Sequence, residues 1–282
     1  MRRPFRFGIV GAAIACGLLW TDVGAERPGY PPAEFQARRQ ALAKELKAGT
    51  LLMFGRTAPI AGIRFRQDND FFYLTGNEDL NAALVMDAAS GAATLFLPRQ
   101  TPGDIRALGK NWLEDPEAGK PWGFAAIRPI QDLPAVLARL ALSPEPVLWT
   151  RLSPGDEADI NRGEQASDHA KRLGNPGGGH LTEDAARAAF LRAQFPSLQL
   201  RDVAPAIDSM RTIKSAREIE ILRENGRISA EAIRRAILAT RENGFEYEIE
   251  AEATWWMFRN GIQGNSFPPI VGSGPNVNVW HY

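Results

Sequence analysis

The sequence predicts an α/β domain over residues 26–205, followed by a second region of long helices over residues 206–282. Three observations carry this prediction. Short apolar runs of strand length alternate with amphipathic segments in the first region, which is the pattern of an α/β fold. After Pro205 the hydrophobic periodicity changes to that of long helices. A length of 282 residues is also typical of two domains.

The elements of the first domain follow from periodicity and from their end signals. A helix is expected over residues 34–47, with Phe35, Leu42 and Leu46 on one stripe and Gly49 after its end. Two more are expected over 133–142 and 182–193, the second capped by Thr182. Strands are expected over 50–54, 70–74, 82–86, 93–97, 147–150 and 198–203. The polar stretch 153–179 is expected to be a loop.

The second region begins with a helix-start signal. Ser215 and Glu218 have the spacing of a capping box, and the helix is expected to end at Asn243-Gly244. A second helix is expected over 246–260. A short strand is then expected from Phe267, entering a glycine loop at 272–274, and the apolar ending 279–282 has the character of a strand.

The first 25 residues predict a signal peptide and therefore an exported, periplasmic or extracellular protein. Arg2, Arg3 and Arg6 precede the uncharged stretch 8–20, and small residues at 23–25 offer a cleavage site before Glu26. A membrane-spanning helix is the alternative, but 13 residues rise only about 20 Å, short of the ~30 Å hydrocarbon core. The arginine pair leaves Sec and twin-arginine export both open.

Cys16 is the only cysteine and lies within this segment. A lipid anchor on Cys16 has weak support, because the residues around it do not have the expected pattern. Cleavage after Ala25 leaves no cysteine, which excludes disulfides, zinc–thiolate sites and cysteine nucleophiles from the mature protein.

Composition and motifs exclude several other functions. Lysine plus arginine and aspartate plus glutamate both number 33, so the net charge of zero argues against a nucleic-acid partner. No HExxH, GxSxG or phosphate-loop motif occurs. His169 and His180 lie in the polar stretch without metal-ligand spacing and are interpreted as solvated.

Two stretches are unusual for a purely structural role. Residues 65–76 (FRQDNDFFYLTG) set charged groups against an aromatic run. They fit a satisfied polar loop, with Arg66 paired to Asp68 or Asp70, or an arginine presented at an interface or cleft. Residues 264–282 carry a glycine loop ahead of His281, which fits either a core histidine or a functional one.

Three segments together resemble the Xaa-Pro aminopeptidases, the aminopeptidase P group of the creatinase and prolidase superfamily. Residues 66–76 are similar to the hallmark of that family's N-terminal domain. Residues 211–220 (RTIKSAREIE) are similar to the junction that opens its catalytic domain. Residues 267–276 (FPPIVGSGPN) with His281-Tyr282 are similar to the strands leading to its active site.

The resemblance implies a creatinase-like α/β N-terminal domain and the incomplete start of an α+β pita-bread domain. It also implies two divalent metals, commonly manganese, held by two Asp, two Glu and one His that follow the His281-Tyr282 pair. His281 then corresponds to a histidine that contacts the substrate and is not a metal ligand. The expected partners are peptides with proline at position two and further copies of the chain.

Three readings of the whole chain stay open. It is a fragment of an exported Xaa-Pro aminopeptidase, without the metal ligands and inactive alone, or a complete non-catalytic binding or oligomerisation protein, or a prolidase-like relative. The fragment is the preferred hypothesis, because the apolar ending resembles an unfinished sheet.

Overall fold

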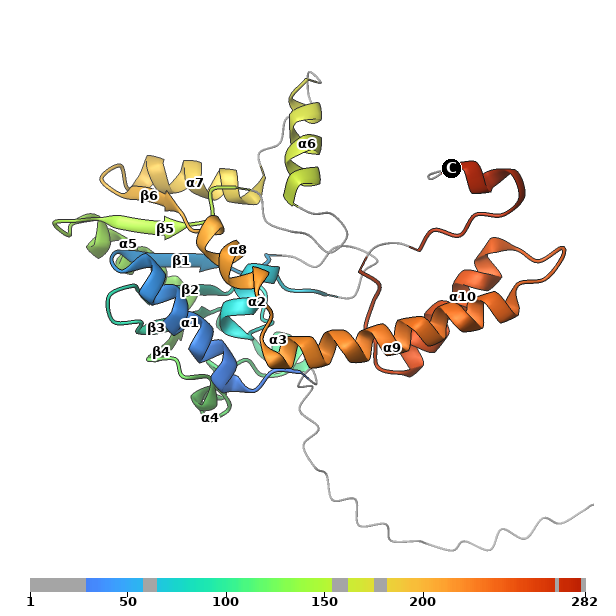
Figure 1. Cartoon of the computed structure of the whole chain (residues 1–282). Coiled ribbons are helices and arrows are strands. Elements are labelled where there is room, and N and C mark those ends of the chain that lie inside the picture. The colour runs from blue at the N-terminus through green and yellow to red at the C-terminus, as the bar shows by residue number, and fades with distance from the viewer. Residues whose placement is uncertain (1–28, 58–64, 154–161, 175–181, 267–268, 280–282) are drawn as a thin grey trace, which may run out of the picture.

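The computed structural model describes residues 29–57, 65–153, 162–174, 182–266 and 269–279. Figure 1 shows a sheet covered by helices and a pair of long helices that extends away from it. The strands are β1 (Thr50–Phe54), β2 (Ala83–Asp87), β3 (Ala93–Leu97), β4 (Ala126–Pro129), β5 (Val147–Thr150) and β6 (Gln199–Asp202). The helices are α1 (Pro32–Leu46), α2 (Asn69–Thr75), α3 (Pro102–Leu108), α4 (Pro116–Gly119), α5 (Leu133–Ala141), α6 (Arg162–Leu173), α7 (Glu183–Gln194), α8 (Ala204–Thr212), α9 (Ala216–Ala239) and α10 (Glu246–Arg259). Short 3-10 helices are η1 (Lys120–Trp122), η2 (Ile130–Asp132) and η3 (Gly274–Asn278).

The six strands form one mixed sheet in the order β4-β3-β2-β1-β5-β6. β2 runs antiparallel to both β1 and β3, and β2 and β3 form a hairpin. The pairs β3–β4, β1–β5 and β5–β6 are parallel. β1 therefore lies in the middle of the sheet, between the hairpin and the parallel pair.

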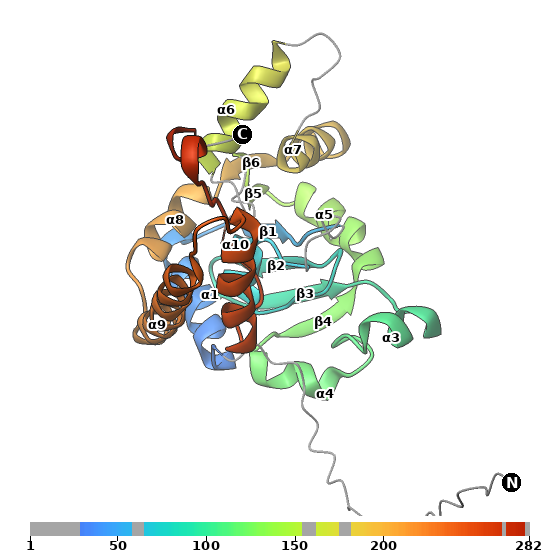
Figure 2. The ribbon, with the colours of Figure 1, turned by 90° about the vertical axis from the view of Figure 1, so that its right-hand side faces the viewer.

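Alternation of side chains divides the core into two layers, one on each face of the sheet. Leu51 and Met53 of β1 point into one layer, and Leu52 points into the other. Leu42 of α1 and Ile207 of α8 belong to the first layer. The second layer is covered by α5 and α7, and Figure 2 shows α1 and α8 on the side of the sheet opposite to α5. The predicted α/β class is therefore confirmed.

The strand predicted over residues 70–74 is wrong, because this segment is helix α2. The Asp68 carboxylate caps the helix by accepting a hydrogen bond from the Phe71 amide at 2.8 Å. Gly76 ends it with a φ of +65°, and a side chain there would meet the Trp122 ring. The aromatic run suggested a strand, but Phe71 and Leu74 are buried at helical spacing.

The loop predicted over 153–179 is also partly wrong, because residues Arg162–Leu173 form α6 and His169 lies in that helix. Its polar composition suggested a loop, although alanine, glutamine, lysine and leucine are good helix formers. His180 lies outside the described residues. The sequence patterns also predict no element at α3, α4, β4 or α8.

Helix α8 contains Pro205, the position of the predicted domain boundary. Val203, Ala204 and Ile207 are buried, and Val203 and Ile207 belong to the core layer that contains α1. Residues as far as this part of α8 therefore pack with the sheet.

Helices α9 and α10 are confirmed close to their predicted bounds, and they pack against each other. The capping box of Ser215 and Glu218 is confirmed. The strand predicted from Phe267 is not present in residues 269–279, where the only regular element is η3. The signal peptide, residues 1–25, and His281 lie outside the described residues. None of the helices in the described ranges has the length and apolar character needed to cross a membrane.

Candidate functional site

A buried cluster of charged residues lies where the carboxyl ends of β1 and β5 meet α2 and α7. Arg151 follows β5 directly, and its guanidinium contacts three carboxylates. The nitrogen–oxygen distances are 2.8 Å to Asp68, 3.2 Å to Asp70 and 2.8 Å to Asp184. All four side chains are close to fully buried. We call this set, with Arg211 and Arg187 described below, the Arg151 cluster.

Local sequence fixes each carboxylate of the cluster. Asp68 is the N-cap of α2, Asp70 lies in its first turn, and Asp184 lies in the first turn of α7 after the Thr182 cap. Carboxylates are favoured at these positions because the helix dipole is positive there. The ends of two helices therefore direct negative charge toward Arg151.

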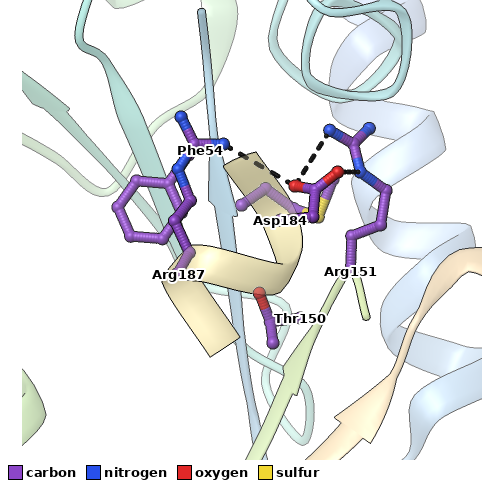
Figure 3. A pocket seen from close by; sticks show the side chains of 6 residues that line it. Phe54, Thr150, Arg151, Asp184 and Arg187 are labelled. Atoms are coloured by element: carbon purple, nitrogen blue, oxygen red, sulfur yellow. Dashed lines mark hydrogen bonds and ion pairs between the residues drawn. The ribbon is translucent and has the colours of Figure 1, made fainter. Parts of the chain in front are cut away.

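Two further arginines balance the charge of the cluster. Arg211 of α8 contacts the second oxygen of Asp70 at 2.5 Å. Arg187 lies 3.6 Å from Asp184 and 2.7 Å from Glu183. Figure 3 shows the Asp184 carboxylate between Arg151 and Arg187. Burial alone would lower the pKa of Arg151, but the charges of Asp68 and Asp184 outweigh it and the pKa is raised.

A small pocket opens beside the cluster. It is lined by Arg151, Asp184 and Arg187 together with Met53, Phe54 and Thr150 (Figure 3). This is the edge of a parallel pair where α/β proteins often bind ligands. Here, however, each carboxylate of the cluster is paired with an arginine. None of these groups therefore offers the pocket a free base or a free cation. The cluster is suited to holding α2, α7 and α8 together.

The structure thus favours the satisfied polar loop as the interpretation of residues 66–76. The cations seen against Asp68 and Asp70 are Arg151, which the sequence analysis did not single out, and Arg211, which it noted only within the segment 211–220. A signal for Arg151 existed, since it follows a predicted strand at its carboxyl end. Its partners could not be identified, because Asp70 is 81 positions away in the sequence.

The glycine loop before His281 is attached to the start of α10. The Glu246 carboxylate accepts hydrogen bonds from the Ser273 amide at 2.6 Å and from the Ser273 hydroxyl at 2.8 Å. The Asn276 side-chain amide donates to the same oxygen at 3.3 Å. These hydrogen bonds hold the loop at Ser273 and Asn276 against the start of α10, whereas His281 lies outside the described residues.

A metal site would need several histidine, cysteine, aspartate or glutamate side chains close together. Across the described ranges there is no group of three or more such residues that could hold a metal ion. The Arg151 cluster does not supply one, because its carboxylates are already bound to guanidinium groups.

Comparison with known proteins identifies two segments in order. Residues 35–149 match the family described as aminopeptidase P, N-terminal domain, and residues 220–282 match metallopeptidase family M24. The Xaa-Pro aminopeptidase of Escherichia coli is 28% identical over 88% of this chain and 54% of that protein. The human Xaa-Pro dipeptidase is 26% identical over 92% of this chain and 50% of that protein.

Solved structures give the same result at the level of the fold. Aminopeptidase P from Escherichia coli in its low-pH form has a TM-score of 0.68 and 26% identity, over 90% of this chain and 55% of that one. The chain therefore spans about half the length of the relatives that it matches.

Proposed function

We propose that this chain, an aminopeptidase P-type protein with an α/β N-terminal domain and part of a pita-bread domain, is part of an exported Xaa-Pro aminopeptidase. The reaction is removal of the N-terminal residue before a penultimate proline. The observation that carries the proposal is the order of the two family matches on one chain, together with Xaa-Pro aminopeptidase relatives along most of its length.

The metallopeptidase match implies divalent metals, and we propose two ions, supplied as manganese in an assay. When bound, such ions supply an activated water and stabilise negative charge on the attacked carbonyl. The described residues do not fit a metal, since they hold no suitable ligand group. The resemblance places all five ligands after His281-Tyr282, so we propose that the 282 residues alone do not turn over substrate.

Within this chain, we propose that His281 contacts the substrate beside the metals. A neutral imidazole at that place can donate a hydrogen bond to the substrate carbonyl or to the developing oxyanion. Ser273 and Glu246 would then act indirectly, because their hydrogen bonds fix the loop that leads to His281. We further propose that residues 1–25 are removed on export and that the N-terminal domain forms contacts between copies of the chain.

The first experiment compares the purified chain with a version extended by the codons that follow residue 282. Hydrolysis of an Xaa-Pro peptide is measured with added manganese, and an Xaa-Ala peptide serves as the control for contaminating peptidases. We expect turnover only from the extended protein, and intact mass of the exported protein should show a start near Glu26. Turnover by the 282 residues alone, or none after extension, would contradict the proposal; the second result would favour a non-catalytic binding protein.

The role of His281 is tested by His281→Ala in the extended protein. Loss of a positioned hydrogen-bond donor typically lowers kcat by ~10²–10³. We expect that loss with unchanged metal content and melting temperature. Near-normal turnover with a lowered melting temperature would show instead that His281 is a core histidine.

A further inference from the structure

The connection between the sheet-centred domain and the α9–α10 pair is short. Helix α8 ends at Thr212 and α9 begins at Ala216, so three residues separate the two helices. Ile213 between them is exposed and contributes no core packing there. Figure 1 shows α9 leaving the domain beside α1 and extending away from the sheet. Contacts between the first turn of α9 and the domain therefore bear on the direction of α9.

Arg38 of α1 supplies the central contact at this point. Its guanidinium donates a hydrogen bond to Glu34 at 2.7 Å and lies 3.2 Å from Glu218 of α9. It also donates to the Tyr73 carbonyl oxygen and lies over the rings of Tyr30 and Tyr73. A planar guanidinium can hold two carboxylates and two rings in one geometry, which a lysine cannot do.

The first turn of α9 shares atoms with this contact. The Ser215 hydroxyl donates to the same Glu34 oxygen that accepts from Arg38, at 2.7 Å. Glu218 uses one carboxylate oxygen for Arg38 and the other for the Ser215 amide. The capping box of α9 and its attachment to α1 are therefore one hydrogen-bonded unit, and α9 cannot tilt without breaking part of it.

The length of α9 amplifies any change at this point. Its 24 residues span roughly 36 Å, so a tilt of about 10° at Ser215 would displace the far end by about 6 Å. The side chains of Arg38, Glu34 and Glu218 are 8%, 15% and 14% exposed, so salt screens their attraction only weakly. A small buried contact thus controls the position of a long element.

We propose that Arg38 is a positioning residue, and that with Glu34, Ser215 and Glu218 it forms a charged joint that sets the direction of the α9–α10 pair relative to the sheet. This inference concerns orientation and does not depend on the proposed hydrolysis.

The test measures a distance across the joint in the full chain. Spin labels are attached at Glu45→Cys on α1 and Ala239→Cys at the end of α9, both exposed positions, in a Cys16→Ser background. Pulsed electron resonance then gives the distribution of distances. In Arg38→Met, which keeps the aliphatic stem but leaves two carboxylates facing each other, we expect the mean to shift or the width to grow by several ångströms.

Two further variants make the result specific. Glu218→Gln keeps a side chain that can complete the capping box but removes the charge that Arg38 holds, so it should change the distribution in the same sense. Arg227→Met is the control, because its ion pair with Glu224 lies within α9 and does not reach α1. The proposal is overturned when Arg38→Met and Glu218→Gln match the parent, or when Arg227→Met moves the distance equally. If Arg38→Met does not fold, Glu218→Gln decides alone.

Discussion

The sheet-centred domain and the α9–α10 pair differ in how far they bury their apolar side chains. In the domain, Leu84, Phe71 and Ile207 are fully buried. In α9, Leu222 is 54% exposed and Ile233 is 62% exposed. The difference is not one of composition, since both regions have large aliphatic side chains at regular spacing. It shows that periodicity predicts an amphipathic element but does not say what covers it.

Helix α9 has two apolar sides. Ile228 and Ala232 are buried, whereas Ile219, Leu222, Ile233 and Ile237 recur at helical spacing and are exposed. Polar atoms do not divide as cleanly, because buried atoms without a hydrogen-bond partner among the described residues occur in both regions, with Arg56 Nε in the domain. In α10, Thr254 Oγ1 and Trp256 Nε1 are buried without a hydrogen-bond partner in the described residues. In the domain, the buried guanidinium of Arg39 donates to three backbone carbonyls.

The largest expected effect concerns the buried charges of the domain. Arg151→Met would leave Asp68, Asp70 and Asp184 with much less positive charge in a buried place, and loss of one partner from such a cluster costs about 3–5 kcal/mol. Urea denaturation of the full chain measures this loss. Arg128→Met is the control, because both side chains of its pair with Asp132 are 39% exposed and the pair should contribute at most about 1 kcal/mol. Equal losses in both variants would show that the cluster does not stabilise the domain.

The next prediction tests the contrast between the regions with one residue type. Leu84→Ala removes a fully buried side chain from β2 and should cost about 2–5 kcal/mol. Leu222→Ala removes a half-exposed side chain from α9 and should change stability by no more than about 0.5 kcal/mol. Denaturation midpoints compare the two. A large loss from Leu222→Ala would mean that the exposed side of α9 is covered in solution, by another copy or another part of the protein.

The smallest effect depends on pH. Burial raises the pKa of the Asp79 carboxyl, against a smaller lowering by the hydrogen bond from Asn77. The folded state then holds this proton more tightly than the unfolded state, so stability falls as the pH rises through the folded pKa. Asp79→Asn should therefore stabilise the protein at pH 7, by less than Leu84→Ala destabilises it, and the gain should shrink toward pH 4.

Asp87 is the matched control for that experiment. Hydrogen bonds from Ser90 lower the pKa of the Asp87 carboxyl, so its contribution to stability is present above the unfolded pKa and lost as the pH falls. Asp87→Asn should destabilise at pH 7, and the loss should shrink at low pH. Changes of the same sign in both variants would contradict the assigned environments of the two carboxyl groups.

Local sequence was sufficient to predict the strands of the sheet centre. The runs at 50–54, 93–97 and 147–150 are bounded by turn residues and were predicted with the bounds seen in the structure. It was insufficient where two local signals compete. In residues 69–75 the Asp68 cap and Gly76 terminus outweigh the strand preference of the aromatic run. The edge strand β4 is half-buried throughout and carries no clear alternation, so it gave no signal.

The candidate site was less predictable than the fold. Residues 66–76 were recognised as unusual, and their carboxylates prove to be centred on Arg151. That partner is contributed by a strand far away in the sequence, and no local pattern specifies such a pairing. The Arg38 joint could not be predicted for the same reason, because Glu34 and Ser215 are 181 positions apart in the sequence.

The central place of β1 has a consequence for how the protein is made. Its neighbour β2 follows soon after it in the chain, but its other neighbour, β5, begins only at Val147. A ribosome adding 5–20 residues per second needs roughly 5–20 s to synthesise the intervening ~100 residues. During that interval one edge of β1 has no partner strand and can pair with other nascent chains. Slow synthesis between β1 and β5 therefore prolongs the period in which one edge of β1 is open to aggregation.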